Sequence, residues 1–290
     1  MESNSAENQE RIIIGIHGLL NKPPKADLES DWRKAIEEGL ERNFDLNEEV
    51  PFRMVYWADV RHESPLSDND EPYVKAAGDG PLKRYDPGFL DKARAIANKY
   101  AGRWADVEKQ LTGLGTNVES LIGIKFDDLA DYYDKPEIRQ EMRARLSEVL
   151  EQQQGNRIML IAHSMGSIIA YDVLRTFDGA ATPVIEHFVT IGSPLGLPIV
   201  GHKIRDEFGG PQTPTIVRQW TNIADPGDKV ALDCALSDEY SPAGDVQVED
   251  VLTLNGYESP AGEPNNHKSY GYLRAPEVSE VIGDFLARAE

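Results

Sequence analysis

Ser164 has the sequence surroundings of a serine that attacks carbonyl groups. It is the third residue of the pentapeptide Ala162-His-Ser-Met-Gly166, between two apolar runs at residues 157–161 and 168–174. The order strand, sharp turn, helix is the context in which a small-x-Ser-x-Gly sequence forms a nucleophile elbow. Small residues flank such a serine because larger side chains would collide, and Ala162 stands where Gly is more common. The segment therefore predicts a nucleophilic serine.

A histidine that could activate this serine follows it in the chain. A serine hydroxyl needs a neighbouring base, and the base needs an acid that orients it. In elbow-type hydrolases the acid and then the histidine come after the serine. His187 begins a predicted core strand and His202 lies in a loop, whereas His267 lies between the last predicted strand and the last helix. We therefore predict His267 as the base.

Two aspartates compete for the role of the acid. Asp225 and Asp228 both lie in the stretch Trp220–Val230, close to the end of a predicted strand. Asp225 precedes a proline in a turn, where aspartate commonly makes structural hydrogen bonds. Asp228 precedes a short return of apolar sequence at residues 229–232. We predict Asp228 as the acid and keep Asp225 as the alternative.

Two backbone N–H groups are expected to bind the oxyanion that forms during acyl transfer. One belongs to Met165, the residue after the nucleophile. The other belongs to the loop after the first strand, where Gly18 lets the backbone turn, and we predict the N–H of Leu19. We expect His17 to brace this loop by hydrogen bonding and to take no part in the chemistry.

The composition is that of a globular protein and narrows the possible partners. The 290 residues are 40% hydrophobic and 28% charged, which supports a large core. The net charge of −20 disfavours nucleic acid and anionic membrane surfaces. The acidic, polar first ten residues do not resemble a signal peptide, and no apolar run approaches the length of a membrane span. These features predict a cytoplasmic protein without stable membrane insertion.

The single cysteine, Cys234, excludes an intramolecular disulfide.

Apolar patterns along the chain predict an α/β fold of one domain, residues 1–290, with about six mostly parallel strands flanked by helices. The predicted strands are residues 12–16, 52–58, 158–162, 187–191, 216–220 and 246–254. Helical spacing of apolar residues is found at 28–40, 138–150, 168–174 and 278–286.

Residues 60–136 do not fit this alternation, because they are too long for one connection between a strand and a helix. Residues 60–88 are rich in Pro, Gly and Asp and are predicted to form loops. Apolar residues then recur at helical spacing from Phe89 to Leu111, and a second apolar segment covers residues 118–133. We predict a helical insert with two alternative roles. It packs at the edge of the sheet, or it forms a cap, fixed or as a mobile lid, over the active site.

The chain resembles the α/β-hydrolases of the serine esterase and lipase type. The matching segments are residues 16–19, 162–166, 190–195, 225–228 and 267–270. The resemblance implies that Gly192 and Ser193 lie near the active site without doing chemistry. Two features depart from the family pattern: the two leading strands of the full fold are missing, as in compact lipases, and the insert precedes the nucleophile strand.

These features predict a serine hydrolase that cleaves a small-molecule carboxylic ester through an acyl-enzyme, with no cofactor and no metal ion. The same residues could serve a thioesterase, a peptidase or an acyltransferase, because the motifs do not report the scissile bond. A hydrolase-like binding protein without turnover is the alternative outside enzymes. The sequence does not indicate the oligomeric state or the acyl-chain length.

Overall fold

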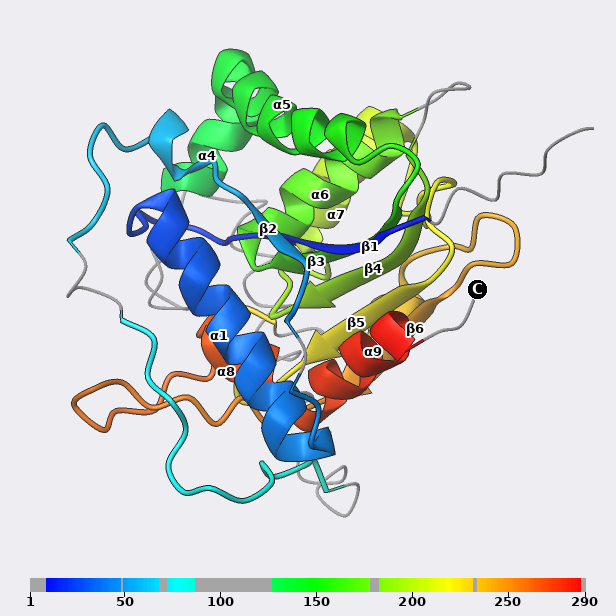
Figure 1. Cartoon of the computed structure of the whole chain (residues 1–290). Helices are drawn as coiled ribbons and strands as arrows, with labels where there is room; N and C mark the ends of the chain where they lie inside the picture. The colour runs from blue at the N-terminus through cyan, green and yellow to red at the C-terminus, as the bar shows by residue number, and fades with distance from the viewer. Residues whose placement is uncertain are drawn as a thin grey trace, which may run out of the picture.

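Six parallel strands form a single sheet in the computed structural model (Figure 1), which describes residues 9–47, 49–67, 72–86, 127–177, 183–231 and 234–287. The order across the sheet is β2-β1-β3-β4-β5-β6. The strands are β1 (Arg11–Ile16), β2 (Phe52–Val55), β3 (Arg157–His163), β4 (Ile185–Ile191), β5 (Trp220–Ala224) and β6 (Val248–Leu252). The parallel sheet flanked by helices confirms the predicted α/β class.

Helices cover both faces of the sheet (Figure 1). One face carries α4 (Asp127–Asp134), α5 (Pro136–Gln152), α6 (Met165–Thr176) and α7 (Pro198–Phe208). The other face carries α1 (Lys25–Phe44), α8 (Ser269–Arg274) and α9 (Pro276–Ala287). Two short 3-10 helices, η1 (Ala58–Val60) and η3 (Leu236–Asp238), complete the named elements among the described residues.

Burial on both faces explains the continuous apolar sequence of the central strands. Successive side chains of a strand point to opposite faces. Leu160 accordingly packs with the helices of the α6 face, whereas its neighbours Met159 and Ile161 pack with those of the α1 face. All three side chains are inaccessible to solvent. Apolar side chains suit both faces of such a strand, so the apolar run indicates a central position in the sheet.

The predicted fifth strand, residues 216–220, is wrong in position, because β5 begins only at Trp220. Val217 instead follows a turn in which its N–H bonds to the carbonyl of Pro214, and it makes only an isolated bridge to Ile185. The apolar pattern did not indicate β5 because the polar residues Thr221 and Asn222 occupy its centre. Thr221 bonds His187 of β4 (2.8 Å), and Asn222 bonds Asp250 of β6 (2.9 Å). Lateral pairing of this kind lets polar side chains occupy a buried strand.

The predicted helical insert, residues 60–136, lies largely outside the described residues. Within it, the structure shows α4 and the segments 60–67 and 72–86, which have no strand and no helix beyond the end of η1. The apolar stripe from Phe89 to Leu111 and most of the segment 118–133 fall outside the described residues. The insert and its possible role as a cap stay predictions.

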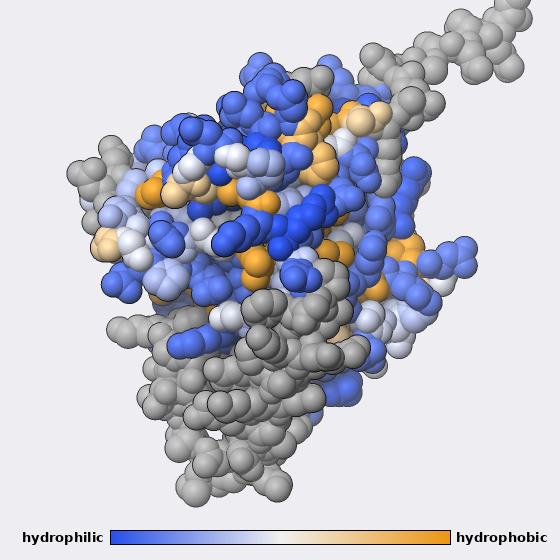
Figure 2. Space-filling model, turned by 90° about the horizontal axis from the view of Figure 1, so that it is seen from below, coloured by the Kyte–Doolittle hydropathy of each residue, from blue (hydrophilic) through white to orange (hydrophobic). Residues whose placement is uncertain are grey.

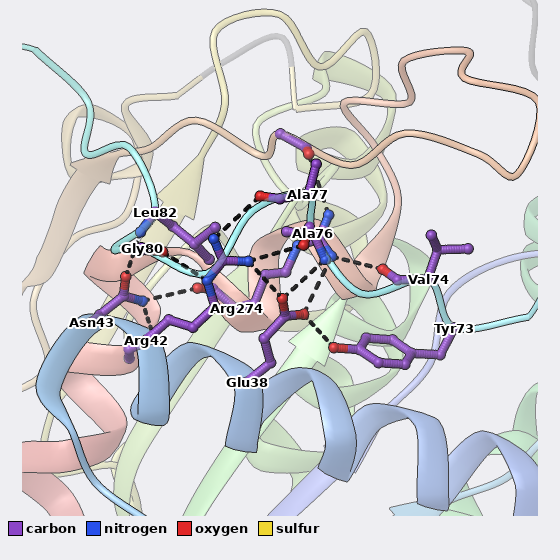
Figure 3. A network of polar contacts seen from close by, with 12 residues as sticks. Glu38, Arg42, Asn43, Tyr73, Val74, Ala76, Ala77, Gly80, Leu82 and Arg274 are labelled. Carbon is purple, nitrogen blue, oxygen red and sulfur yellow. Dashed lines mark hydrogen bonds and ion pairs between the residues drawn. The ribbon is translucent and has the colours of Figure 1, made fainter.

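A buried charge network attaches the segment around residues 73–82 to α1 and α8 (Figure 3). Glu38 of α1 accepts hydrogen bonds from the Ala76 N–H (2.9 Å), from Arg42 (3.0 Å) and from the hydroxyl of Tyr73. Arg274 of α8 lies 3.4 Å from Glu38 and donates to the carbonyl of Val74 (2.7 Å). Because both ionic side chains are nearly inaccessible to solvent, these bonds determine the path of a segment that has no regular secondary structure.

A second buried carboxylate joins α4, α5 and α6. Asp172 of α6 is 1% exposed and accepts from Tyr132 (2.6 Å), Arg139 (2.9 Å) and Arg143 (2.6 Å). Both arginines also pair with Glu207 of α7, which is partly exposed. Asp172 and Glu207 together therefore balance the charges of the two arginines at a junction where several helices meet.

Among the residues coloured by hydropathy in Figure 2, most of the surface is hydrophilic, and hydrophobic residues form small separate groups. This agrees with the strong excess of acidic residues. Within the part of the chain that the structure describes, no helix has both the length and the apolar character needed to cross a membrane.

We predict that Asp172→Ala lowers the free energy of unfolding by about 3 kcal/mol or more, because it removes the buried carboxylate that pairs with Arg139 and Arg143 and accepts from Tyr132. Glu207→Ala, which removes the exposed partner of the same arginines, should cost less than about 1 kcal/mol. Urea unfolding followed by circular dichroism measures both values. Equal losses in the two variants would contradict the role assigned to Asp172.

Candidate active site

The three residues predicted to cooperate lie at the carboxyl edge of the parallel sheet. Ser164 directly follows β3, and Asp228 comes four residues after the end of β5. His267 lies in the loop after β6, two residues before α8. Loops that leave the carboxyl ends of neighbouring parallel strands meet at one edge, which is where α/β proteins commonly bind ligands.

Ser164 occupies a strained turn between β3 and α6. Its backbone angles, φ 54° and ψ −131°, are unusual for a residue with a side chain and cost on the order of 1–3 kcal/mol. The Ser164 N–H donates to the carbonyl of Ile191 at the end of β4 (3.2 Å). The Ser164 carbonyl accepts from the N–H (2.9 Å) and the hydroxyl (2.6 Å) of Ser167. These bonds hold the serine in the geometry expected of a nucleophile elbow.

A hydrogen-bond chain runs from the serine to an aspartate through a histidine. His267 Nε2 lies 2.9 Å from Ser164 Oγ, and His267 Nδ1 lies 2.8 Å from Asp228 Oδ2. A carboxylate can only accept, so Nδ1 carries the proton and Nε2 is able to accept the serine proton. Ser164 and Asp228 are buried, while a quarter of the His267 side chain is exposed.

Asp228 is held by donors on both of its oxygens. Oδ1 accepts from the Val230 N–H (2.8 Å), and Oδ2 accepts from the Tyr272 hydroxyl (2.8 Å) as well as from His267. Burial, and then the charge of Asp228, raise the pKa of Tyr272 well above its usual value, so its hydroxyl remains a donor. A Cβ at Gly192, where φ is +54°, would lie 2.9 Å from Asp228 Oδ2, so only glycine leaves room there.

Asp225, the alternative acid, does not touch His267. Its carboxylate accepts from the N–H groups of Gly227 (2.7 Å) and Asn255 (2.8 Å) and from the side chain of Asn266 (3.0 Å). Asp225 therefore connects the loop after β5 to the loop that carries His267. This is the structural role that an aspartate before a proline commonly has.

His163 supports the same constellation and was missed by sequence reasoning. Its Nε2–H donates to the carbonyl of His267 (2.8 Å), and the two rings lie 4.7 Å apart. Burial, and then the positive charge that His267 can carry, lower the pKa of His163 well below its usual value. His163 is thus a neutral donor that holds the backbone of His267. Its position beside Ser164 was the only signal in the sequence.

The loop after β1 lies directly against the elbow. A Cβ at Gly18 would lie 2.6 Å from Ser164 Cβ, and a Cβ at Gly166 would lie 2.6 Å from the carbonyl oxygens of Ile16 and His17. These two glycines therefore permit a close approach, in which Gly166 packs on backbone carbonyls and Gly18 packs on the Ser164 side chain. Among the described residues, the N–H groups of Leu19 and Met165, predicted as oxyanion donors, have no hydrogen-bond partner.

His17 fixes the peptide unit whose N–H belongs to Leu19. Its Nδ1–H donates to the carbonyl of Gly18 (2.9 Å), and its Nε2 accepts from the N–H of Trp57 (3.1 Å). Because C=O and N–H point in opposite directions in a trans peptide, this bond turns the Leu19 N–H away from His17. Burial, and then the charge of Lys22, lower the pKa of His17 to about 3.

The Gly192-Ser193 segment, expected near the site without a role in chemistry, lies beside the elbow. Ser193 Oγ bonds Ser167 Oγ (2.7 Å) and accepts from the Leu195 N–H (3.2 Å). Within the described residues, no cluster of His, Cys, Asp or Glu side chains is placed to hold a metal ion. The expectation that no cofactor is needed stays a prediction.

A family model described as lecithin:cholesterol acyltransferase matches residues 45–199, slightly more than half of the chain. The matched part contains Ser164 and Gly192, whereas Asp228 and His267 lie beyond its end. No curated protein matches the sequence.

The lowered pKa of His17 predicts a specific loss of stability in acid. The unfolded chain binds a proton at this residue below about pH 6.5, whereas the folded chain does not until about pH 3. The free energy of unfolding should therefore fall by about 1.4 kcal/mol per pH unit through this window. His17→Asn should remove this contribution from the slope, measured by urea unfolding at several pH values. The exposed residue His202 provides the control, and equal slopes for His17→Asn and His202→Asn would refute the prediction.

Proposed function

The chain belongs to the lecithin:cholesterol acyltransferase family of α/β-hydrolase-type lipases and acyltransferases, and we propose that it breaks lipid acyl esters with Ser164 as nucleophile. The observation that carries this proposal is the hydrogen-bond chain from Ser164 through His267 to Asp228. The strained backbone of Ser164 supports the same conclusion, because such strain is typical of a nucleophile elbow.

The first half of the proposed reaction forms an acyl-enzyme. Ser164 Oγ attacks the ester carbonyl carbon while its proton passes to His267 Nε2. The N–H groups of Leu19 and Met165 bind the negatively charged oxygen of the tetrahedral intermediate. The bond to the alcohol oxygen then breaks, and His267 returns the proton to the leaving alcohol. Asp228 stabilises the imidazolium and keeps the proton of the neutral ring on Nδ1.

The second half releases the acyl group. A water molecule attacks the carbonyl carbon of the acyl-enzyme while its proton passes to His267. The bond to Ser164 Oγ then breaks, and His267 returns the proton to Ser164, which releases the carboxylic acid. An alcohol that attacks in place of water yields a new ester, which is the transferase outcome that the family's description favours. Ser164, His267 and Asp228 serve both outcomes, so the molecule that accepts the acyl group, water or an alcohol, decides between them. Thioesters and amides could react by the same steps.

We predict that Ser164→Ala abolishes hydrolysis of p-nitrophenyl acyl esters while the chain stays folded, because the acyl-enzyme cannot form. A fluorophosphonate probe should label the natural chain and fail to label the variant, as measured by mass spectrometry. Ser237→Ala, at an exposed serine of η3, is the control and should keep its labelling. Undiminished turnover by Ser164→Ala, or absence of labelling in the natural chain, would reject an enzyme of this type. Adding a long-chain alcohol to the same assay separates hydrolysis from transfer by the product formed.

We predict different effects for the two aspartates. Asp228→Asn should lower kcat by about 10⁴-fold, because an amide favours the wrong tautomer of the histidine. Asp225→Asn should mainly lower the melting temperature and keep most of the activity, because its contacts connect two loops. Steady-state kinetics and thermal unfolding of both variants provide the comparison. A kinetic loss confined to Asp225→Asn would assign the acid to Asp225.

A further inference from the structure

Leu20 has an unfavourable backbone conformation that contacts from other residues must stabilise. Its φ of 70° lies in the left-handed region, which costs a residue with a side chain about 1–2 kcal/mol. Half of the Leu20 side chain is exposed, so packing of that side chain does little to hold it. Leu20 directly follows Leu19, whose N–H is one of the two proposed oxyanion donors. The position of that donor therefore depends on what holds Leu20.

The peptide unit between Leu19 and Leu20 is held at both ends by side chains. The Leu20 N–H donates to Asp128 Oδ2 (2.7 Å), and the Leu19 carbonyl accepts from the ammonium group of Lys22. The bond to Asp128 joins residues 108 positions apart. A hydrogen bond from an N–H to a carboxylate is about twice as strong as one between neutral groups, so it can offset the strain at Leu20.

Asp128 is itself fixed by its surroundings. It is the second residue of α4 and is only 3% exposed. Its other oxygen, Oδ1, lies 3.5 Å from Arg61 Nε and 3.8 Å from His62 Nε2. Neighbouring Asp131 pairs with the same arginine and with Lys135, and no contact joins it to the loop after β1 among the described residues. Asp128 and Asp131 thus lie on the same helix and pair with the same arginine, but only Asp128 bonds the Leu20 N–H among the described residues.

We propose that Asp128 is a positioning residue of the oxyanion site: by holding the Leu20 N–H, it keeps the Leu19 N–H directed at the oxygen that becomes negative. This inference rests on the proposed function of Ser164. Asp128 touches neither Ser164 nor His267 in the structure, so it acts through the backbone of the loop. Its contribution belongs to the transition state, because negative charge develops on the oxygen there and is absent from the bound ester.

The test compares Asp128→Ala and Asp128→Asn with Asp131→Ala in steady-state kinetics on a p-nitrophenyl ester. Asp128→Ala should lower kcat by about 10-fold or more, approaching the 10²–10³ of a deleted oxyanion donor, with KM changed by less than about threefold. Asp128→Asn keeps a neutral acceptor and should lose less. Asp131→Ala should keep kcat, and inhibition by an alkyl boronic acid should weaken in parallel with the loss of kcat.

A second substitution separates positioning from general stability. Leu20→Gly in the Asp128→Ala background should restore part of kcat, because glycine adopts a positive φ without the penalty of a side chain. The proposal would be overturned if folded Asp128→Ala and Asp128→Asn had the same kcat as the natural chain, or if only KM increased. Should the alanine variant not fold, the asparagine variant decides by the same comparison. Loss of activity in Ser164→Ala with natural kcat in the Asp128 variants would leave the proposed function intact and reject the positioning role alone.

Discussion

The contact between the end of β1 and the start of α6 is the constraint on which the site depends. Backbone carbonyls of Ile16 and His17 approach Gly166 so closely that no side chain fits between them, and Gly18 lies equally close to Ser164. This contact brings a loop near the beginning of the chain against a turn some 150 residues later. Because it is made of backbone, it fixes the two segments without depending on side-chain rotamers. The strained serine and the neighbouring N–H groups share this one rigid element.

The remaining parts reach this element through polar bonds among buried groups. Tyr272 and the Val230 N–H hold Asp228, and His163 holds the backbone of His267. Each donor or acceptor is neutral or has a defined partner, which is the condition for placing polar groups in a core at low cost. Of Ser164, His267 and Asp228, only His267, in the middle of the hydrogen-bond chain, retains appreciable exposure. The arrangement therefore combines fixed geometry with access from solvent.

Sequence patterns predicted those parts that depend on local order, and missed those that depend on distant contacts. Continuous apolar runs indicated the central strands because both faces of the sheet are covered, and the order of Ser164, Asp228 and His267 follows from the order of the strands. Trp220–Ala224 was misplaced because its polar residues are paired with neighbouring strands. Asp128 and Tyr272 gave no signal, since their partners lie 108 and 44 positions away in the chain.

The two ends of the long connection between β2 and α5 are fixed independently of each other. Glu38 and Arg274 secure residues 73–76 near its beginning (Figure 3). Asp172 and Asp128 secure α4 at its close. A stretch of chain secured in this way can change in length and composition over evolutionary time without moving the residues around Ser164. Related chains could therefore keep one set of reacting groups while differing widely between these two points.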